Sequence, residues 1–144
     1  MCAISGIIGG ASYSVDELKL KEISDRMVLR GPDNGDYYID KNIGLAHRRL
    51  SIIDLSTGDQ PMKIAGGSIV IVYNGEVYNY QKIRDELIEK GCKFNSTSDT
   101  EVVVQAYQQY GIEGCPHQFL QHVLHGHDAV GTAELVQQDH QMGL

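Results

Sequence analysis

The sequence is short of cysteine, of basic runs and of long apolar runs, and each shortage argues against a class of protein. The three cysteines, Cys2, Cys92 and Cys115, are odd in number and lack metal-type spacing, so we do not expect a disulfide framework. No apolar run approaches the roughly 18 residues that a membrane-spanning helix needs. The longest basic run is 47–49, and the net charge is −7, which together argue against nucleic-acid binding.

The composition that remains is ordinary for a soluble globular protein, with 42% hydrophobic and 22% charged residues. A chain of 144 residues is expected to form one core. The scarce cysteines fit a reducing cytoplasm, and the acidic charge fits a small zwitterionic substrate better than a polyanion. The first residues lack the basic and apolar segments of a secretory leader, so we expect the mature terminus to arise by removal of Met1 alone.

Removal of Met1 would make Cys2 the N-terminal residue, carrying both a thiol and a free α-amine. The amine titrates near ~8 and the thiol near ~8.5, so a proton can pass between them directly or through one water. A single residue can therefore supply the nucleophile and the base of a covalent mechanism. The alternative is that Cys2 is simply a small buried hydrophobe, and the dipeptide alone favours this alternative.

Hydrophobic periodicity and turn residues predict alternating strands and helices. The strands are expected over residues 4–9, 36–40, 43–54, 68–73 and 93–95. Three helices are expected. The first begins at a capping box of Ser14 and Glu17 and stops before Gly31, and the second spans 81–90. The third begins at Asp99, after a capping box of Ser98 and Glu101, and stops at Gly111. Lys41-Asn42 should join two of the strands in a tight hairpin.

The strongest strand, 68–73, runs directly into Asn74-Gly75, a pair that favours a sharp turn. A thiolate that attacks an amide generates an oxyanion, and the Asn74 side-chain amide and the Gly75 backbone N–H can donate to it. Each such donor lowers the barrier by roughly 2.7–4 kcal/mol. The alternative, which an arbitrary Asn-Gly pair favours, is that these residues only form the turn.

An amino-acid substrate needs a cation for its carboxylate and an acid for its ammonium group. Arg49 can bind a carboxylate through two parallel hydrogen bonds, and Arg48, on the opposite face of the strand, is an internal control. Asp99 and Glu76 are candidates for the ammonium group. The alternatives are that Arg49 faces water and that Asp99 only stabilises the first turn of a helix.

Together these features follow a family pattern in order. From Met1 to about Gly114 the chain resembles the glutaminase domain of asparagine synthetases, the class II glutamine amidotransferases with an N-terminal nucleophile fold. The matching stretches are 1–6 (MCAISG), 30–33 (RGPD), 47–54 (HRRLSIID), 73–79 (YNGEVYN) and 98–101 (SDTE). The segment Gly58-x-Gln60-Pro61 also looks more like asparagine synthetase than like other amidotransferases of this class.

The resemblance implies an α/β fold, a four-layer αββα sandwich, and a role for each matching site residue. The implied roles are Cys2 as nucleophile, Asn74 and Gly75 as oxyanion hole, Arg49 as carboxylate clamp, Glu76 and Asp99 as amino-group partners, and backbone contacts to glutamine around Leu50 and Ile52. The implied reaction converts glutamine and water into glutamate and ammonia without a cofactor. ATP and Mg²⁺ would belong to a synthetase domain that this sequence does not contain.

Two departures from the family pattern change the expectations. Ala3 stands where the family most often has glycine, and a small residue is tolerated there if φ is negative. After Gly114 the family pattern stops, so we expect a glutaminase core over 1–115, an atypical tail over 116–144, and a sandwich truncated at its C-terminal end. Apolar faces left open would be covered by a synthetase domain or subunit, or by a second copy of the chain.

Two other hypotheses remain. The first is that the chain is not an active glutaminase but a non-catalytic remnant that binds glutamine or a partner without turnover. The tail also holds five of the six histidines, His117, His122, His125, His127 and His140, which raises the weaker idea of a metal-binding appendage. We assign no metal ligand, because no cysteine or carboxylate pattern accompanies them.

Overall fold

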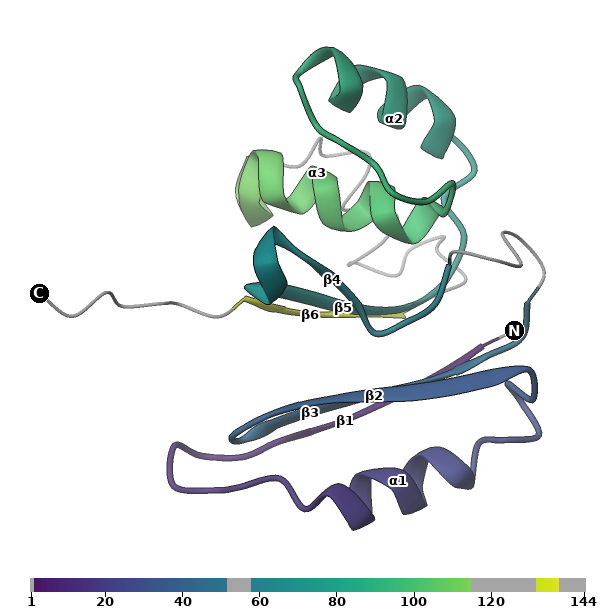
Figure 1. Ribbon diagram of the computed structural model, residues 1–144, viewed down its shortest axis with the longest axis vertical. Coiled ribbons are helices and arrows are strands. Elements are labelled where there is room, and N and C mark those ends of the chain that lie inside the picture. Colours follow the sequence, from purple (N-terminus) through teal and green to yellow (C-terminus); the bar gives the residue numbers. More distant parts are fainter. Residues whose placement is uncertain (1, 52–57, 115–131, 138–144) are drawn as a thin grey trace, which may run out of the picture.

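The computed structural model describes residues 2–51, 58–114 and 132–137, which form two antiparallel sheets and three α-helices. In chain order the elements are β1 (Ala3–Ile8), α1 (Glu17–Asp25), β2 (Asn34–Asp40), β3 (Ile43–Arg49), β4 (Met62–Ile64), the 3-10 helix η1 (Ala65–Gly67), β5 (Ile69–Asn74), α2 (Tyr80–Glu89), α3 (Asp99–Gly114) and β6 (Thr132–Gln137). The strand orders are β1-β3-β2 and β4-β5-β6. Figure 1 shows the two sheets stacked, with α1 outside the first and α2 and α3 outside the second.

The first sheet is built around β3, which pairs with β1 from Ala3↔Arg48 to Ile8↔Ile43. It pairs with β2 through the hairpin at Lys41-Asn42, where Lys41 has a φ of 48°. The predicted hairpin is therefore confirmed. The strand itself ends at Arg49, whereas the prediction ran to Asp54, of which 52–54 lie outside the described residues.

The second sheet is centred on β5, whose side chains are buried on both faces. Val70 and Val72 pack with Leu45 of the first sheet, in the layer between the sheets. Ile71 and Tyr73 point the other way and pack in a cluster with residues of α2 and α3. Because alternate residues of a strand face opposite sides, two apolar environments explain the uninterrupted run Ile-Val-Ile-Val-Tyr.

Helix α1 buries one face against the first sheet, and its N-terminal cap differs from the prediction. Leu20 of α1 packs against Ala46 of β3. The cap of α1 is Asp16, whose carboxylate accepts hydrogen bonds from Leu18 N and Lys19 N, so the expected Ser14 cap is wrong. An ionised carboxylate near a helix N-terminus is favoured both by these donors and by the helix dipole.

The start of α3 at Asp99 is as predicted, and Ser98 Oγ accepts from Thr100 N at 3.1 Å. The carboxylate of Glu101 does not complete a capping box. It accepts from Asn95 N and Ser96 N instead. The N–H of Asn95 is therefore not available for pairing with another strand. The predicted strand over 93–95 does not form.

Two strands were not predicted. The three-residue β4 pairs with β5 from Met62↔Ile71 to Ile64↔Ile69. The longer β6, in the predicted atypical tail, pairs antiparallel with the whole of β5, from Ile69↔Gln137 to Asn74↔Thr132. The segment after Cys115 therefore contributes a strand to the second sheet.

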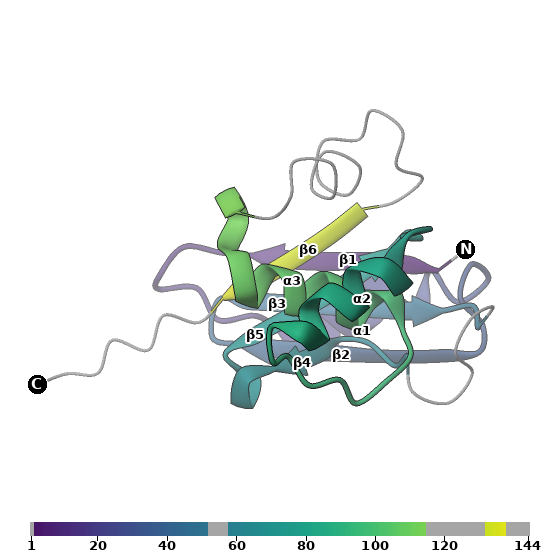
Figure 2. The ribbon, with the colours of Figure 1, turned by 90° about the horizontal axis from the view of Figure 1, so that it is seen from above.

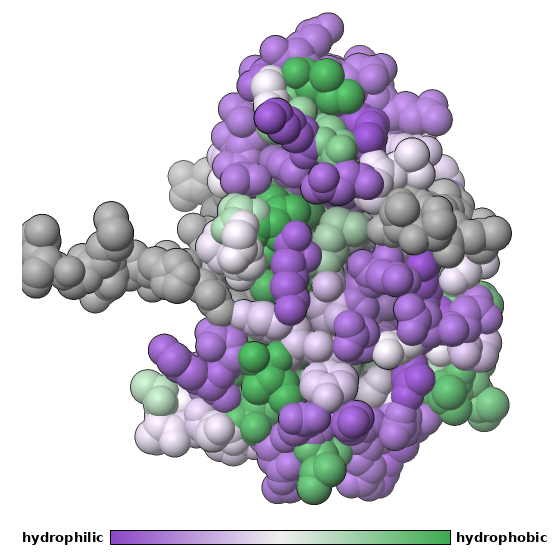
Figure 3. Space-filling view, viewed as in Figure 1, coloured by the Kyte–Doolittle hydropathy of each residue, from purple (hydrophilic) through white to green (hydrophobic). Residues whose placement is uncertain are grey.

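Among the described residues no helix combines the length and apolarity needed to cross a membrane. On the face shown in Figure 3 apolar residues lie in separate patches among hydrophilic ones. Leu29 and Tyr78 are the most exposed large hydrophobic side chains in the described part of the chain, at 94% and 85%. Scattered exposure of this kind is normal for a folded domain.

Candidate active site

The predicted site residues lie where several elements begin or end at one side of the molecule. The start of β1, the end of β3, the end of β5 and the start of α3 are all on the side marked by the N-terminus in Figure 1, and Figure 2 agrees. These positions carry Cys2, Arg49, Asn74 and Asp99. The antiparallel pairing of β1 with β3 brings the first of these next to the second.

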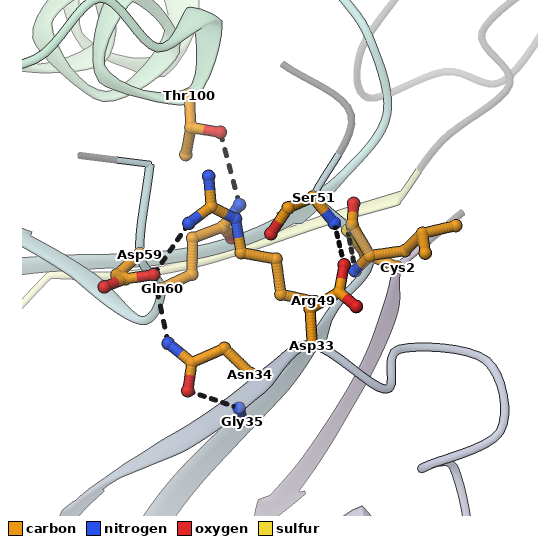
Figure 4. Close-up of polar contacts among 10 residues, drawn as sticks. Cys2, Asp33, Asn34, Gly35, Arg49, Ser51, Asp59, Gln60 and Thr100 are labelled. Carbon is orange, nitrogen blue, oxygen red and sulfur yellow. Dashed lines mark hydrogen bonds and ion pairs between the residues drawn. The ribbon is translucent and has the colours of Figure 1, made fainter. Parts of the chain in front are cut away.

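Cys2 is half-buried and lies against the backbone that follows β3 (Figure 4). Its sulfur accepts a hydrogen bond from Leu50 N at 3.4 Å and is 3.6 Å from Leu50 O. The predicted proximity of Cys2 and Leu50 therefore exists. Ile52, the other predicted backbone contact, lies outside the described residues.

The backbone beside Cys2 is held by residues 31–33, which sequence reasoning gave no role. The Asp33 carboxylate accepts from Ser51 N at 2.7 Å, and Asp33 N donates to Arg49 O at 3.0 Å. A Cβ at Gly31 would lie 2.4 Å from the backbone carbonyl of Arg48, so only glycine allows this approach. The motif Arg-Gly-Pro-Asp thus positions the segment that contacts the thiol.

The two arginines of β3 face opposite sides, as the strand period predicts. Arg48 donates to the carbonyl and hydroxyl oxygens of Ser24 and pairs with Asp25, at the end of α1. Arg49 is buried, at 6% exposure, and its Nη1 is 2.7 Å from Asp59 Oδ1. The guanidinium of Arg49 therefore already binds a carboxylate, within the group of polar contacts drawn in Figure 4.

Asn74 is the last residue of β5, and both Asn74 and Gly75 are half-buried. A Cβ at Gly75 would lie 2.6 Å from the hydroxyl oxygen of Tyr73, two residues earlier. The ring of Tyr73 thus restricts position 75 to glycine.

Gln60 connects two of the elements that carry site residues. Its Oε1 accepts from Tyr73 N at 2.5 Å, next to Asn74, and its Nε2 donates to Thr100 Oγ1 at 3.3 Å, next to Asp99. The side chain is buried, with 9% of the residue exposed. Sequence reasoning found Gln60 only as part of a family-like segment, because nothing local to it indicates its two distant partners.

The candidate ammonium partners differ in their surroundings. Asp99 is half-buried, and its Oδ2 accepts from Val77 N at 3.0 Å, directly after Glu76. Burial raises the pKa of Asp99, while the hydrogen bonds from Val77 and Thr100 oppose that rise. Glu76 is exposed. The structure therefore brings the Asp99 carboxyl group to the turn after β5 that carries Glu76.

His47 is buried beneath the site between the two sheets. Burial, helped by the charge of Arg49, lowers the pKa of His47 from 6.5 to about 4, against a hydrogen bond to the Tyr73 backbone. Its Nε2 has no hydrogen-bond partner among the residues that the structure describes. His47 is therefore a neutral core residue at pH 7 rather than a charged ligand.

No group of three or more His, Cys, Asp or Glu side chains in the described part of the chain is arranged to hold a metal ion. The five tail histidines, on which the metal hypothesis rested, lie outside the described residues. That hypothesis gains no support from the arrangement of the rest.

An α/β fold thus carries a thiol at the start of a strand, a buried arginine paired with a carboxylate, and an Asn-Gly turn on one side of the molecule. A family model described as a glutamine amidotransferase domain matches residues 1–136. The chain belongs to the glutamine amidotransferase domain family. The resemblance found in the sequence is thus confirmed, and the match extends past Gly114, where that resemblance ended.

Curated relatives at 38–44% identity are glutamine-hydrolysing asparagine synthetases. Asparagine synthetase 2 of Bacillus subtilis is 44% identical over 115 residues, which are 78% of this chain and 15% of that protein. Asparagine synthetase 1 of the same species is 40% identical over 113 residues, covering 76% and 18%. The corresponding Arabidopsis thaliana protein is 38% identical over 114 residues, covering 78% and 19%. The chain thus spans less than a fifth of the length of these relatives.

Proposed function

We propose that the chain hydrolyses the side-chain amide of glutamine to glutamate and ammonia, with Cys2 as the nucleophile. The thiol attacks the amide carbon, its proton passes to the α-amine of the same residue and then to the departing ammonia, and water resolves the thioester. Asn74 and Gly75 would donate to the oxyanion. The observation that carries the proposal is the contact of Cys2 with Leu50, the residue that follows the buried Arg49.

Substrate binding in this proposal divides between two charged groups. Arg49 would bind the α-carboxylate, and Asp99 with Glu76 would bind the ammonium group. A site with an arginine and two acids suits a zwitterion, because each charge of the substrate can then meet the opposite charge. The paired sheets flanked by helices support assignment to the N-terminal nucleophile sandwich, shortened at its C-terminal end, with all substrate contacts within residues 1–115.

The ammonia needs an acceptor, and the relatives supply a hypothesis for it. Because they are asparagine synthetases several times longer than this chain, we propose that a synthetase domain or subunit takes up the ammonia. The second candidate function is a glutamine-binding module without turnover, and a glutamate-release assay distinguishes it from the glutaminase.

Glutamate release by the untagged chain, combined with intact mass, tests the proposal. We expect the mass of a chain lacking Met1, release of glutamate and ammonia in equal amounts, and loss of release in Cys2→Ala with an unchanged circular dichroism spectrum. An N-terminal extension should abolish activity in the same way, because it acylates the α-amine. Undiminished release by Cys2→Ala would overturn the covalent mechanism, and binding without release by the unmodified chain would favour the binding module.

A further inference from the structure

The guanidinium of Arg49 is already paired with a carboxylate from this chain. Arg49 Nη1 lies 2.7 Å from Asp59 Oδ1, and the same oxygen accepts from Asn34 Nδ2 at 3.1 Å. Figure 4 shows the guanidinium pointing toward Asp59, with Cys2 at the other side of the cluster. The chemical group that Arg49 binds in this structure is the one that a glutamine substrate would bring to it.

We propose that Asp59 is an internal competitor for the substrate carboxylate and so sets the affinity for glutamine. This inference rests on the proposed function, in which Arg49 is the carboxylate clamp. The Asp59 carboxylate occupies the Nη1 donor of Arg49 in the substrate-free protein. We expect glutamine to displace it, because two carboxylates at one guanidinium repel each other.

The two partners of the ion pair are placed differently, which makes displacement feasible. The Arg49 side chain is 8% exposed, whereas the Asp59 side chain is 63% exposed. An exposed carboxylate regains water when it leaves, so its ion pair contributes little to stability. The arginine stays buried, where a bound carboxylate stabilises its charge.

Asp59 also has space on its other side. It borders an open hollow whose other lining residues are Pro61, Met62, Lys63, Ile64, Asn95, Ser96 and Glu101. A displaced Asp59 side chain can rotate toward this open hollow, where its carboxylate regains water. Asp59 thus has two environments between which the substrate can shift it.

The opposite role for Asp59 predicts the opposite effect. If Asp59 served to hold Arg49 in its binding position, its removal would loosen the guanidinium and weaken glutamine binding. If it competes, its removal strengthens binding. The direction of the change in affinity therefore decides between the two roles.

Calorimetric titration of glutamine into the full chain carrying Cys2→Ala provides the measurement, since binding is then separated from turnover. We expect Asp59→Asn to lower the Kd about two- to fivefold, as loss of a largely exposed ion pair would. Asp59→Ala should act in the same direction. Asn34→Ala should also lower the Kd, but more weakly, because it removes a hydrogen bond that holds the Asp59 carboxylate in place. Asp85→Asn, an equal change of charge at an exposed position of α2, should leave the Kd unchanged.

Arg49→Lys in the same background separates the two levels of the proposal. If Arg49→Lys weakens binding but both Asp59 variants leave the Kd unchanged or raise it, the competitor role alone is overturned. If Arg49→Lys has no effect, or if no glutamine binding is measurable in the parent protein, the proposed function fails first. A Kd lowered equally by Asp85→Asn would show a general charge effect and would also overturn the competitor role.

Discussion

The neighbouring arginines of β3 have different partners, so they offer a matched pair of substitutions. We expect Arg49→Lys to reduce kcat/KM for glutamine about tenfold or more, because a lysine cannot reproduce the paired donors of a guanidinium. Arg48→Lys should change kcat/KM less than twofold. It should instead lower the free energy of unfolding by about 1 kcal/mol, through its bonds to Ser24 and Asp25.

Steady-state glutamate release and urea unfolding of both variants check this prediction. Equal losses of kcat/KM in the two variants would contradict the clamp assignment. An unfolding effect confined to Arg49→Lys would contradict the contacts of Arg48 with α1.

His47 gives the protein a pH-dependent stability at the scale of one residue. Because its pKa is lowered to about 4, the folded state keeps the imidazole neutral while the unfolded state takes up a proton below pH 6.5. The stabilisation is complete above pH 6.5 and is lost as the pH falls toward 4. Between pH 7.5 and 5 the protein should lose about 2 kcal/mol from this residue.

His47→Asn is the control, because it removes the titrating ring and keeps a polar side chain with an N–H donor. Urea unfolding at the two pH values should show a smaller pH dependence in the variant than in the parent. The raised pKa of Asp99 opposes this trend, but it is present in both proteins and cancels in the comparison. An identical pH dependence of the two proteins would show that His47 is not buried neutral.

At the scale of single elements, α1 has two polar residues at its start and one of them is the cap. Asp16→Ala should lower the free energy of unfolding by about 1 kcal/mol, because two backbone N–H groups of the first turn lose their acceptor. Ser14→Ala, two residues earlier and exposed, should have little effect. Thermal or urea unfolding distinguishes them, and a larger loss in Ser14→Ala would restore the capping box expected from the sequence.

At the scale of the whole molecule, β6 determines whether β5 is an internal strand or an edge. β6 pairs with every residue of β5, from Ile69 to Asn74. Deleting 132–144 should therefore lower the free energy of unfolding and promote self-association, since it exposes a long apolar edge. Deleting only 138–144 should do neither.

Urea midpoints and light scattering over a range of protein concentrations test the two deletions. Because no proposed substrate contact lies after Cys115, glutamate release per folded molecule should survive both. Loss of catalysis in a deletion that remains folded and monomeric would place part of the chemistry in the tail. Unchanged stability without 132–144 would contradict the role of β6.

The sequence alone determined the features that depend on local periodicity and on single residue types. The alternation of the arginines of β3, the hairpin at Lys41-Asn42 and the start of α3 were predicted correctly, because each depends on neighbours within a few residues. The family was also evident from five short motifs. The chemistry assigned to those motifs remains a proposal that the experiments above test.

The tertiary structure decided the features whose partners lie far apart in the chain. The stretch that forms β6 has only weak periodicity of its own, and it becomes a strand through pairing with β5, about 60 residues earlier. Asp59 reaches Arg49, and Gln60 reaches Tyr73 and Thr100, across loops whose composition indicates no partner. Local pattern specifies which groups a residue offers, whereas only the packed fold determines which group it meets.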